Sequence, residues 1–131
     1  MIQFFGCKNV ALRDFFVTNS PFWCIHLLHC DGVLCDGLRY DAKLVNNDGI
    51  DLEMTRNVLI ENVVFNNGDD NIAIKAGRDN DGWGTNKNIA PRGKEALYEP
   101  WPCENIVVRN CVFKGLHGVV IGSEMSAGVQ N

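Results

Sequence analysis

The chain has 131 residues, of which 46% are hydrophobic, and this is enough to bury a core and to exclude a disordered chain. The formal net charge is −4 and there is no basic run, which excludes nucleic acid as the main partner. No apolar run approaches the roughly 18 to 20 residues that cross a bilayer, so no membrane span is predicted, and the first residues lack the pattern of a signal peptide.

One sequence pattern recurs four times without gaps. The copies are CKNVALRDFFV (7–17), CDGVLCDGLRY (30–40), TRNVLIENVVF (55–65) and CENIVVRNCVF (103–113). In each half of a copy, apolar residues occupy every second position, which is the period of a β-strand. Between the two halves, the alternation of apolar residues shifts at a residue that tolerates turn or left-handed backbone. These residues are Asp14, Gly37, Asn62 and Asn110. Each copy is therefore predicted to form two short strands joined by a bend.

A second set of segments alternates with the first. Its members are PFWCIHLL (21–28), NNDGIDLE (46–53), GDDNIAIK (68–75) and GLHGVVIG (115–122). A repeat of about 24 residues without a helical period is typical of a parallel β-helix, whereas a leucine-rich repeat would need a regular Leu and Asn pattern. The predicted fold is all-β, a right-handed parallel β-helix (a single-stranded solenoid) of about five coils, with 1–131 as a single partial β-helix domain.

An insertion at 77–102 separates two copies of the repeat. It reads GRDNDGWGTNKNIAPRGKEALYEPWP, is rich in Gly, Asn and Pro, and has no period, so an inserted loop is predicted. Loops of this length are often functional. Because aromatic and cationic side chains together suit an anionic sugar, Arg78, Trp83 and Trp101 are candidate substrate contacts. The alternative is a lid packed on itself.

The six cysteines contain no CxxC pair, so no zinc site is predicted, and small core residues with free thiols are favoured.

Acidic residues recur at one position of the second set. Asp48 and Asp70 each lie two residues before the apolar residue that recurs in every segment of this set. His117 lies at the same position one coil later, and Asp69 directly precedes Asp70. The repeat therefore places these four side chains on adjacent coils. Because an unpartnered carboxylate pair in a core is costly, the flanking glycines are predicted to bend the chain and turn the acids outward.

Three clustered acids predict a division of protonation states. Like charges a few ångströms apart raise one pKa, so one acid is a proton donor while another is a base. Glycoside hydrolysis needs that division. Two alternatives remain open from the residues alone: the acids are turn residues, or they are calcium ligands.

Four segments resemble motifs of the polygalacturonase family, the pectin-degrading glycoside hydrolase family 28. Residues 46–51 resemble its Asn-Thr-Asp-Gly-Ile motif, and residues 68–75 resemble its Gly-Asp-Asp-x-Ile-Ala-Ile-Lys motif. Residues 116–124 are similar to its Gly-His-Gly motif with the Ile-Gly-Ser-Glu that follows, and residues 19–23 to its Asn-Ser-Pro-x-Trp coil. The family is built on right-handed parallel β-helices, in agreement with the repeat.

The resemblance implies roles for the acids. Asp69 would be the general acid, Asp48 and Asp70 would position and deprotonate the water, and His117 would orient the acid and contact sugar. Lys75 closes its motif either as a substrate contact or in a structural salt bridge. The implied reaction is the inverting hydrolysis of α-1,4-galacturonan or a related pectic polysaccharide, an anionic uronide polymer, with no metal and no cofactor.

The resemblance has departures and rivals. Asn47 replaces the family's Thr, Leu116 replaces the first Gly of Gly-His-Gly, and the family's Arg-Ile-Lys motif is not reached before Asn131. The chain is therefore expected to be a piece of a longer β-helix that lacks full activity by itself. The rivals are a calcium-dependent pectate-lyase-like enzyme and an inactive carbohydrate-binding or structural module. Since pectin lies outside cells, a secreted or periplasmic parent protein is expected.

Overall fold

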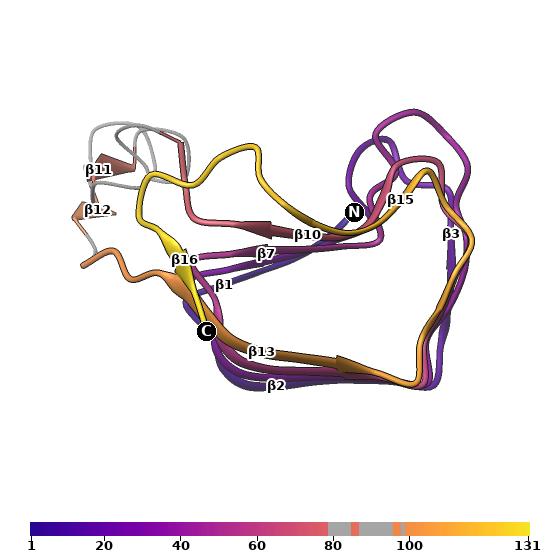
Figure 1. Cartoon of the computed structure of the whole chain (residues 1–131), viewed down its shortest axis with the longest axis horizontal. Helices are drawn as coiled ribbons and strands as arrows, with labels where there is room; N and C mark the ends of the chain where they lie inside the picture. Colours follow the sequence, from indigo (N-terminus) through magenta and orange to yellow (C-terminus); the bar gives the residue numbers. More distant parts are fainter. Residues whose placement is uncertain (79–84, 87–95, 98) are drawn as a thin grey trace.

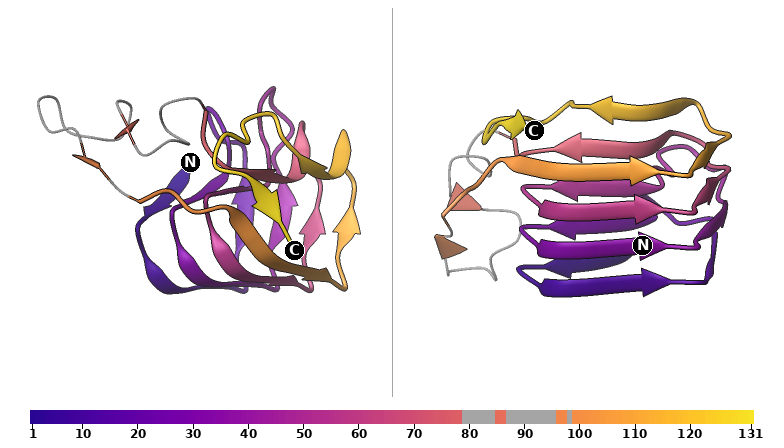
Figure 2. Two further views of the ribbon diagram at one scale, coloured as in Figure 1. Left: turned by 60° about the vertical axis from the view of Figure 1, so that its left-hand side comes forward. Right: turned by 60° about the horizontal axis from the view of Figure 1, so that its bottom comes forward.

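A parallel β-helix is the architecture of the computed structural model, which describes residues 1–78, 85–86, 96–97 and 99–131. Every element in these residues is a β-strand, and the chain winds into stacked coils (Figures 1 and 2). Three parallel sheets run along the stack, and the third has four strands, so four coils are complete where about five were expected. Among the described residues, no helix is both long and apolar enough to span a membrane.

The three sheets collect strands from successive coils. The first contains β1 (Ile2–Phe5), β4 (Ile25–Leu28), β7 (Ile50–Glu53), β10 (Asp70–Lys75) and β15 (His117–Ile121) in that order. The second runs from β16 (Val129–Gln130) through β13 (Cys103–Arg109), β8 (Arg56–Glu61) and β5 (Asp31–Asp36) to β2 (Lys8–Arg13). The third contains β14 (Val112–Phe113), β9 (Val64–Phe65), β6 (Arg39–Asp41) and β3 (Phe16–Thr18).

The register confirms the predicted alignment of the repeats. In the first sheet Ile50 pairs with Ile25 on one side and with Ile72 on the other, and in the second sheet Val58 lies between Val33 and Ile106. The predicted bends have left-handed backbone, with φ of 54°, 71°, 57° and 51° at Asp14, Gly37, Asn62 and Asn110. A second left-handed position, which was not predicted, opens the second-sheet strands at Asn9, Gly32, Asn57 and Asn105.

The core fills the space between the three sheets. Its inward residues stack from coil to coil, as in the aromatic row where Tyr40 lies 4.9 Å from Phe65 and Phe65 lies 5.4 Å from Phe113, between ring centroids. The six cysteines are free thiols, as predicted, and four of them are buried in or beside this core. Burial raises the pKa of the Cys35 thiol to about 12, so this residue is an inert apolar group.

The insertion at 77–102 lies between β10 and β13. It contains a short antiparallel pair, β11 (Thr85–Asn86) with β12 (Ala96–Leu97), where only a loop was expected. Trp83 lies outside the described residues, so its assignment as a substrate contact stays a prediction.

Candidate active site

The three acids and the histidine lie on neighbouring coils, as the repeat predicts. Asp48 precedes β7, Asp69 and Asp70 lie at the start of β10, and His117 opens β15. The backbone N–H of Gly49 donates to the carbonyl of Asp70 over 2.8 Å, and Asp70 pairs in register with His117. The hydrogen-bonded backbones of three coils thus fix the spacing of these side chains.

Two buried asparagines hold the turns that carry the acids. The amide of Asn47 donates to the carbonyl of Ser20 over 2.7 Å, and its oxygen accepts from the Ser20 N–H over 3.2 Å. The amide of Asn67 donates to the carbonyls of Asp69 and Asp70 over 3.1 and 2.8 Å. Each turn is therefore held through backbone groups, and the carboxylates of the acids are left available.

The flanking glycines permit close approach between coils. A Cβ at Gly49 would lie 2.4 Å from the carbonyl oxygen of Asn71 and 2.8 Å from the ring of Phe65, and neither Gly49 nor Gly68 has positive φ. They therefore bring two coils together, and the backbone bends at both glycines, as was expected. Asp48 is nevertheless buried, since it is only 4% exposed.

The remaining members of the cluster are more accessible. Asp69 and Asp70 are partly buried and His117 is exposed. The Nδ1 of His117 lies 2.8 Å from Oδ1 of Asp70, and the Asp70 N–H donates to Oδ1 of Asp69 over 3.0 Å. His117 therefore orients Asp70, while Asp69 is fixed through the neighbouring backbone.

Asp48 has a raised pKa, and burial contributes more to it than the neighbouring charges from which a raised pKa was expected. Burial raises the pKa of Asp48 to about 6, the charge of Asp69 and then that of Asp70 push it the same way, and the ammonium of Lys75 opposes them. The raised pKa thus belongs to an acid to which the resemblance gives a base role, so it does not by itself identify the proton donor.

Two adjoining hollows open beside the acids. The first, of about 320 Å³, is lined by Asp69, Asp70, His117, Val120, Ile121, Gly122 and Ser123. The second, of about 460 Å³, is lined by Arg78, Ser123, Glu124, Met125 and Ser126. Because they share Ser123, the hollow that contains the guanidinium of Arg78 adjoins the one that contains the carboxylates.

The other predicted substrate contacts are engaged within the chain. Lys75 is 6% exposed, and its ammonium lies 3.2 Å from Oε2 of Glu124, so the salt bridge that was left open from the motif is present. The ring of Trp101 stacks on His29 with 3.7 Å between centroids, and its indole N–H donates to the carbonyl of Met54. The assignment of Lys75 and Trp101 as substrate contacts stays a prediction.

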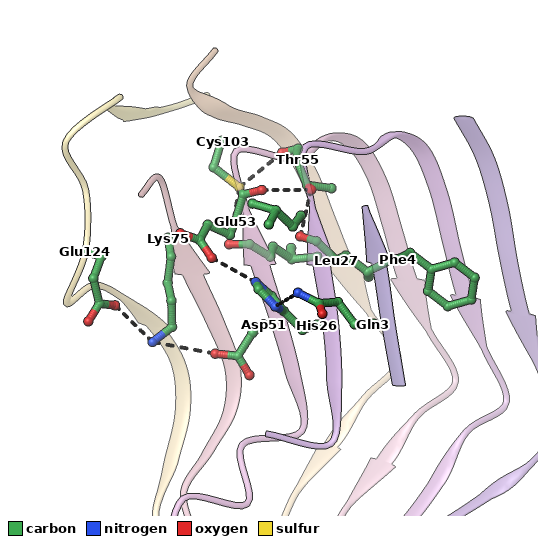
Figure 3. A network of polar contacts seen from close by, with 12 residues as sticks. Gln3, Phe4, His26, Leu27, Asp51, Glu53, Thr55, Lys75, Cys103 and Glu124 are labelled. Carbon is green, nitrogen blue, oxygen red and sulfur yellow. Dashed lines mark hydrogen bonds and ion pairs between the residues drawn. The ribbon is translucent and has the colours of Figure 1, made fainter. Parts of the chain in front are cut away.

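A buried polar row beside the acids was not predicted. It occupies the face of the first sheet that points away from the core, where His26 lies between Gln3 (3.1 Å) and Glu53 (2.8 Å), and where Asp51 lies near Lys75 (Figure 3). In the sequence, polar residues occur at alternate positions of β4, β7 and β10. Such a pattern normally indicates that this face of the strand is exposed to solvent. Here His26, Asp51 and Lys75 are nevertheless buried.

The cluster also has the composition of a cation site. One ligand atom from each of Asp69, Asp70 and His117 lies within 4.8 Å of the others, a set that can hold a metal ion.

The parallel β-helix fold is shared with solved exopolygalacturonase structures. Residues 1–131 match the model of glycosyl hydrolases family 28, and the chain belongs to this family. It is 34% identical over 123 residues to a probable polygalacturonase from Arabidopsis thaliana, covering 87% of this chain and 26% of that one.

Solved structures give the same assignment. A hyperthermoactive exopolygalacturonase from Thermotoga maritima matches with a TM-score of 0.82 and 39% identity, over 98% of this chain and 27% of that one. A family 28 exopolygalacturonase from Yersinia enterocolitica matches with a TM-score of 0.71 and 29% identity, over 92% of this chain and 19% of that one. The chain thus spans between about a fifth and about a quarter of the length of these relatives.

Proposed function

We propose that this chain supplies the catalytic carboxylates of a polygalacturonase that hydrolyses α-1,4-galacturonan, or a related pectic polysaccharide, with inversion. The observation that carries the proposal is the placement of Asp48, Asp69, Asp70 and His117 on adjacent coils, in a chain that belongs to family 28. The substrate class comes from the relatives, whose names describe polygalacturonases and exopolygalacturonases.

The proposed reaction divides the work among the acids. Asp69 donates a proton to the glycosidic oxygen as its bond to the anomeric carbon breaks, and the leaving sugar departs as an alcohol. Asp70 and Asp48 orient a water and accept its proton as its oxygen attacks the opposite face of the sugar. The contact of 2.8 Å between His117 and Asp70 supports a role for the histidine in orienting that carboxylate.

The substrate's negative charge has a candidate partner in Arg78. This residue is exposed and lines the hollow that adjoins the acids through Ser123, where a guanidinium can bind a uronate carboxylate through two hydrogen bonds. Trp83 and Trp101 are proposed as further sugar contacts from the insertion at 77–102. We also propose exo action, in which the insertion at 77–102 blocks one end of the groove. A secreted or periplasmic parent protein is proposed because pectin is extracellular.

The test is release of reducing ends from polygalacturonate by the wild-type chain, Asp69→Asn and the control Asp41→Asn. Asp41 is an exposed acid on β6, away from the cluster. We expect Asp69→Asn to lose about 10²- to 10⁴-fold in rate and the control to lose nothing. Polymer binding by the wild type without turnover would instead identify a binding module.

Product analysis separates the remaining alternatives. Calcium dependence with unsaturated, ultraviolet-absorbing products would replace hydrolysis by a lyase reaction. Release of mixed oligomers in place of mono- or disaccharide would exclude exo action.

A further inference from the structure

Phe22 and Trp23 form an aromatic pair on the outer face of the first sheet. Their rings are stacked, with 4.8 Å between centroids and an angle of 29° between planes. The indole of Trp23 also lies edge-on to the ring of His26, at 5.1 Å between centroids, and its ring centroid is 4.3 Å from the ammonium of Lys75. Because His26 and Lys75 project from the face that points away from the core, Trp23 lies on that face as well (Figure 3).

Phe22 is the accessible member of this pair. It is 44% exposed, whereas Trp23 is partly buried. The contacts of Trp23 with His26 and with the ammonium of Lys75 hold the indole in place beneath solvent, since a cation over an aromatic ring is attracted by its π-electrons. An exposed phenyl ring is therefore supported by a fixed indole.

The turn that carries the pair is bonded to the turn that carries Asp48. Asn47 directly precedes Asp48 and is fully buried. Besides its contacts with Ser20, its side-chain amide donates to the carbonyl of Phe22 over 3.0 Å. The hydroxyl of Ser20 donates to the carbonyl of Trp23 over 3.2 Å. The aromatic pair and the acid turn thus hold a fixed relative position, and a surface that is already ordered loses little entropy when a ligand binds.

One row of residues on the sheet leads from the pair to the hollow beside the acids. His26 pairs in register with Asp51, Asp51 with Ala73, and Ala73 with Val120. Trp23 contacts the first member of this row, and Val120 lines the hollow of about 320 Å³. Since neighbouring strands are about 4.8 Å apart, the ends of the row are about 14 Å apart. A short chain of sugars can span this distance.

We propose that Phe22 and Trp23 form a sugar-binding platform, a subsite for one pyranose ring of the pectic polymer away from the bond that is cleaved. A pyranose ring has a face of C–H groups, and such a face buries apolar area when it stacks on an aromatic ring. The position of the pair on the same sheet face as the acids favours a sugar of the same polymer as the occupant. The identity of that polymer rests on the proposed function.

The test is calorimetric binding of hexagalacturonate and digalacturonate to the whole chain carrying Asp69→Asn, which prevents turnover. Phe22→Ala should weaken the binding of hexagalacturonate about 10-fold. Digalacturonate is too short to occupy the hollow and the platform together. The wild-type platform should therefore bind hexagalacturonate more tightly than digalacturonate, and Phe22→Ala should remove most of that advantage.

The matched control is Phe16→Ala. Phe16 is 60% exposed, more than Phe22, but it lies on β3 in the third sheet. This variant should bind both oligosaccharides as the platform with Phe22 does. Phe22→Tyr keeps the ring and should retain the affinity, and Trp23→Ala should lose it. If Trp23→Ala does not fold by circular dichroism, the variants of the exposed Phe22 decide the question.

Equal affinities for hexagalacturonate in Phe22→Ala and Phe16→Ala would overturn the proposal. So would an equal loss for both oligosaccharides, or no binding of either by the chain with Phe22. In the chain with Asp69 intact, KM for polygalacturonate should rise in Phe22→Ala with kcat nearly constant. Turnover with an unchanged KM would remove the platform and leave the proposed hydrolysis standing, whereas a binding loss in a chain without turnover would do the reverse.

Discussion

Replacing Asp51 by Asn tests how the buried polar row affects stability. Burial, and secondly the charge of Asp48, raise the pKa of Asp51 from 3.8 to about 9, although Lys75 opposes them. Between pH 4 and pH 9 the folded chain therefore retains a proton that the unfolded chain has lost. Since the folded state binds more protons, its stability falls as pH rises through this window.

The magnitude follows from linkage. Each pH unit in which one group is protonated only in the folded state costs about 1.4 kcal/mol, so the wild type loses about 3 kcal/mol from pH 5 to pH 7 through Asp51. Asn has a similar size and does not ionise, so Asp51→Asn lacks this loss. The pKa of Asp48 is also raised, from 3.8 to about 6, so Asp48 causes a similar loss of stability at lower pH. This loss is expected in both the wild type and Asp51→Asn.

The assay is urea unfolding at pH 5, 6 and 7, followed by tryptophan fluorescence and circular dichroism. The stability of Asp51→Asn relative to the wild type should increase by about 3 kcal/mol across this range. The exposed control Asp41→Asn should show no such trend. A difference that is independent of pH would refute the reasoning, because it would mean that Asp51 is ionised and paired with Lys75 in the folded chain.

Three further changes test other parts of the structure. Asp31→Asn should lose about 1 kcal/mol or less at neutral pH and nothing at low pH, because hydrogen bonds from Asn57 and then Arg56 lower the pKa of Asp31 and its contribution disappears as pH falls. Gly49→Ala should cost about 2 kcal/mol or more in thermal or urea unfolding, because its Cβ would overlap the next coil. Thr55→Val should cost about 1 to 3 kcal/mol, because its buried hydroxyl donates to one backbone group and accepts from another.

Each of these changes has a control in the chain. Gly118→Ala should be nearly neutral, since a Cβ there would meet nothing within 4 Å of the described atoms. Thr55→Ser keeps the hydroxyl and should retain most of the stability. Equal losses for Gly49→Ala and Gly118→Ala, or for the Val and Ser variants of Thr55, would contradict the packing and hydrogen-bonding arguments. So would a loss for Asp31→Asn that persists at low pH.

The coil architecture was readable from the sequence because its signals are local. An apolar residue at every second position defines which face of a strand points inward, and turn-tolerant residues such as Asp14 and Asn62 mark the bends. Equivalent residues of successive repeats then stack in register, as Ile50 does between Ile25 and Ile72. The neighbourhood of Asp48, Asp70 and His117 followed from the same repeat.

Only the tertiary structure decided the environment of these residues. The outward face of the first sheet has polar residues, yet Asp51 and Lys75 on it are buried, and Lys75 contacts Trp23 and Glu124, which are distant in the chain. Glu124, which pairs with Lys75, lies 49 residues further along. The burial of Asp48 likewise depends on the contact of Gly49 with the next coil. Local periodicity specifies which side of a strand faces the core, whereas burial of the other side, and with it the pKa of each carboxyl, depends on long-range packing.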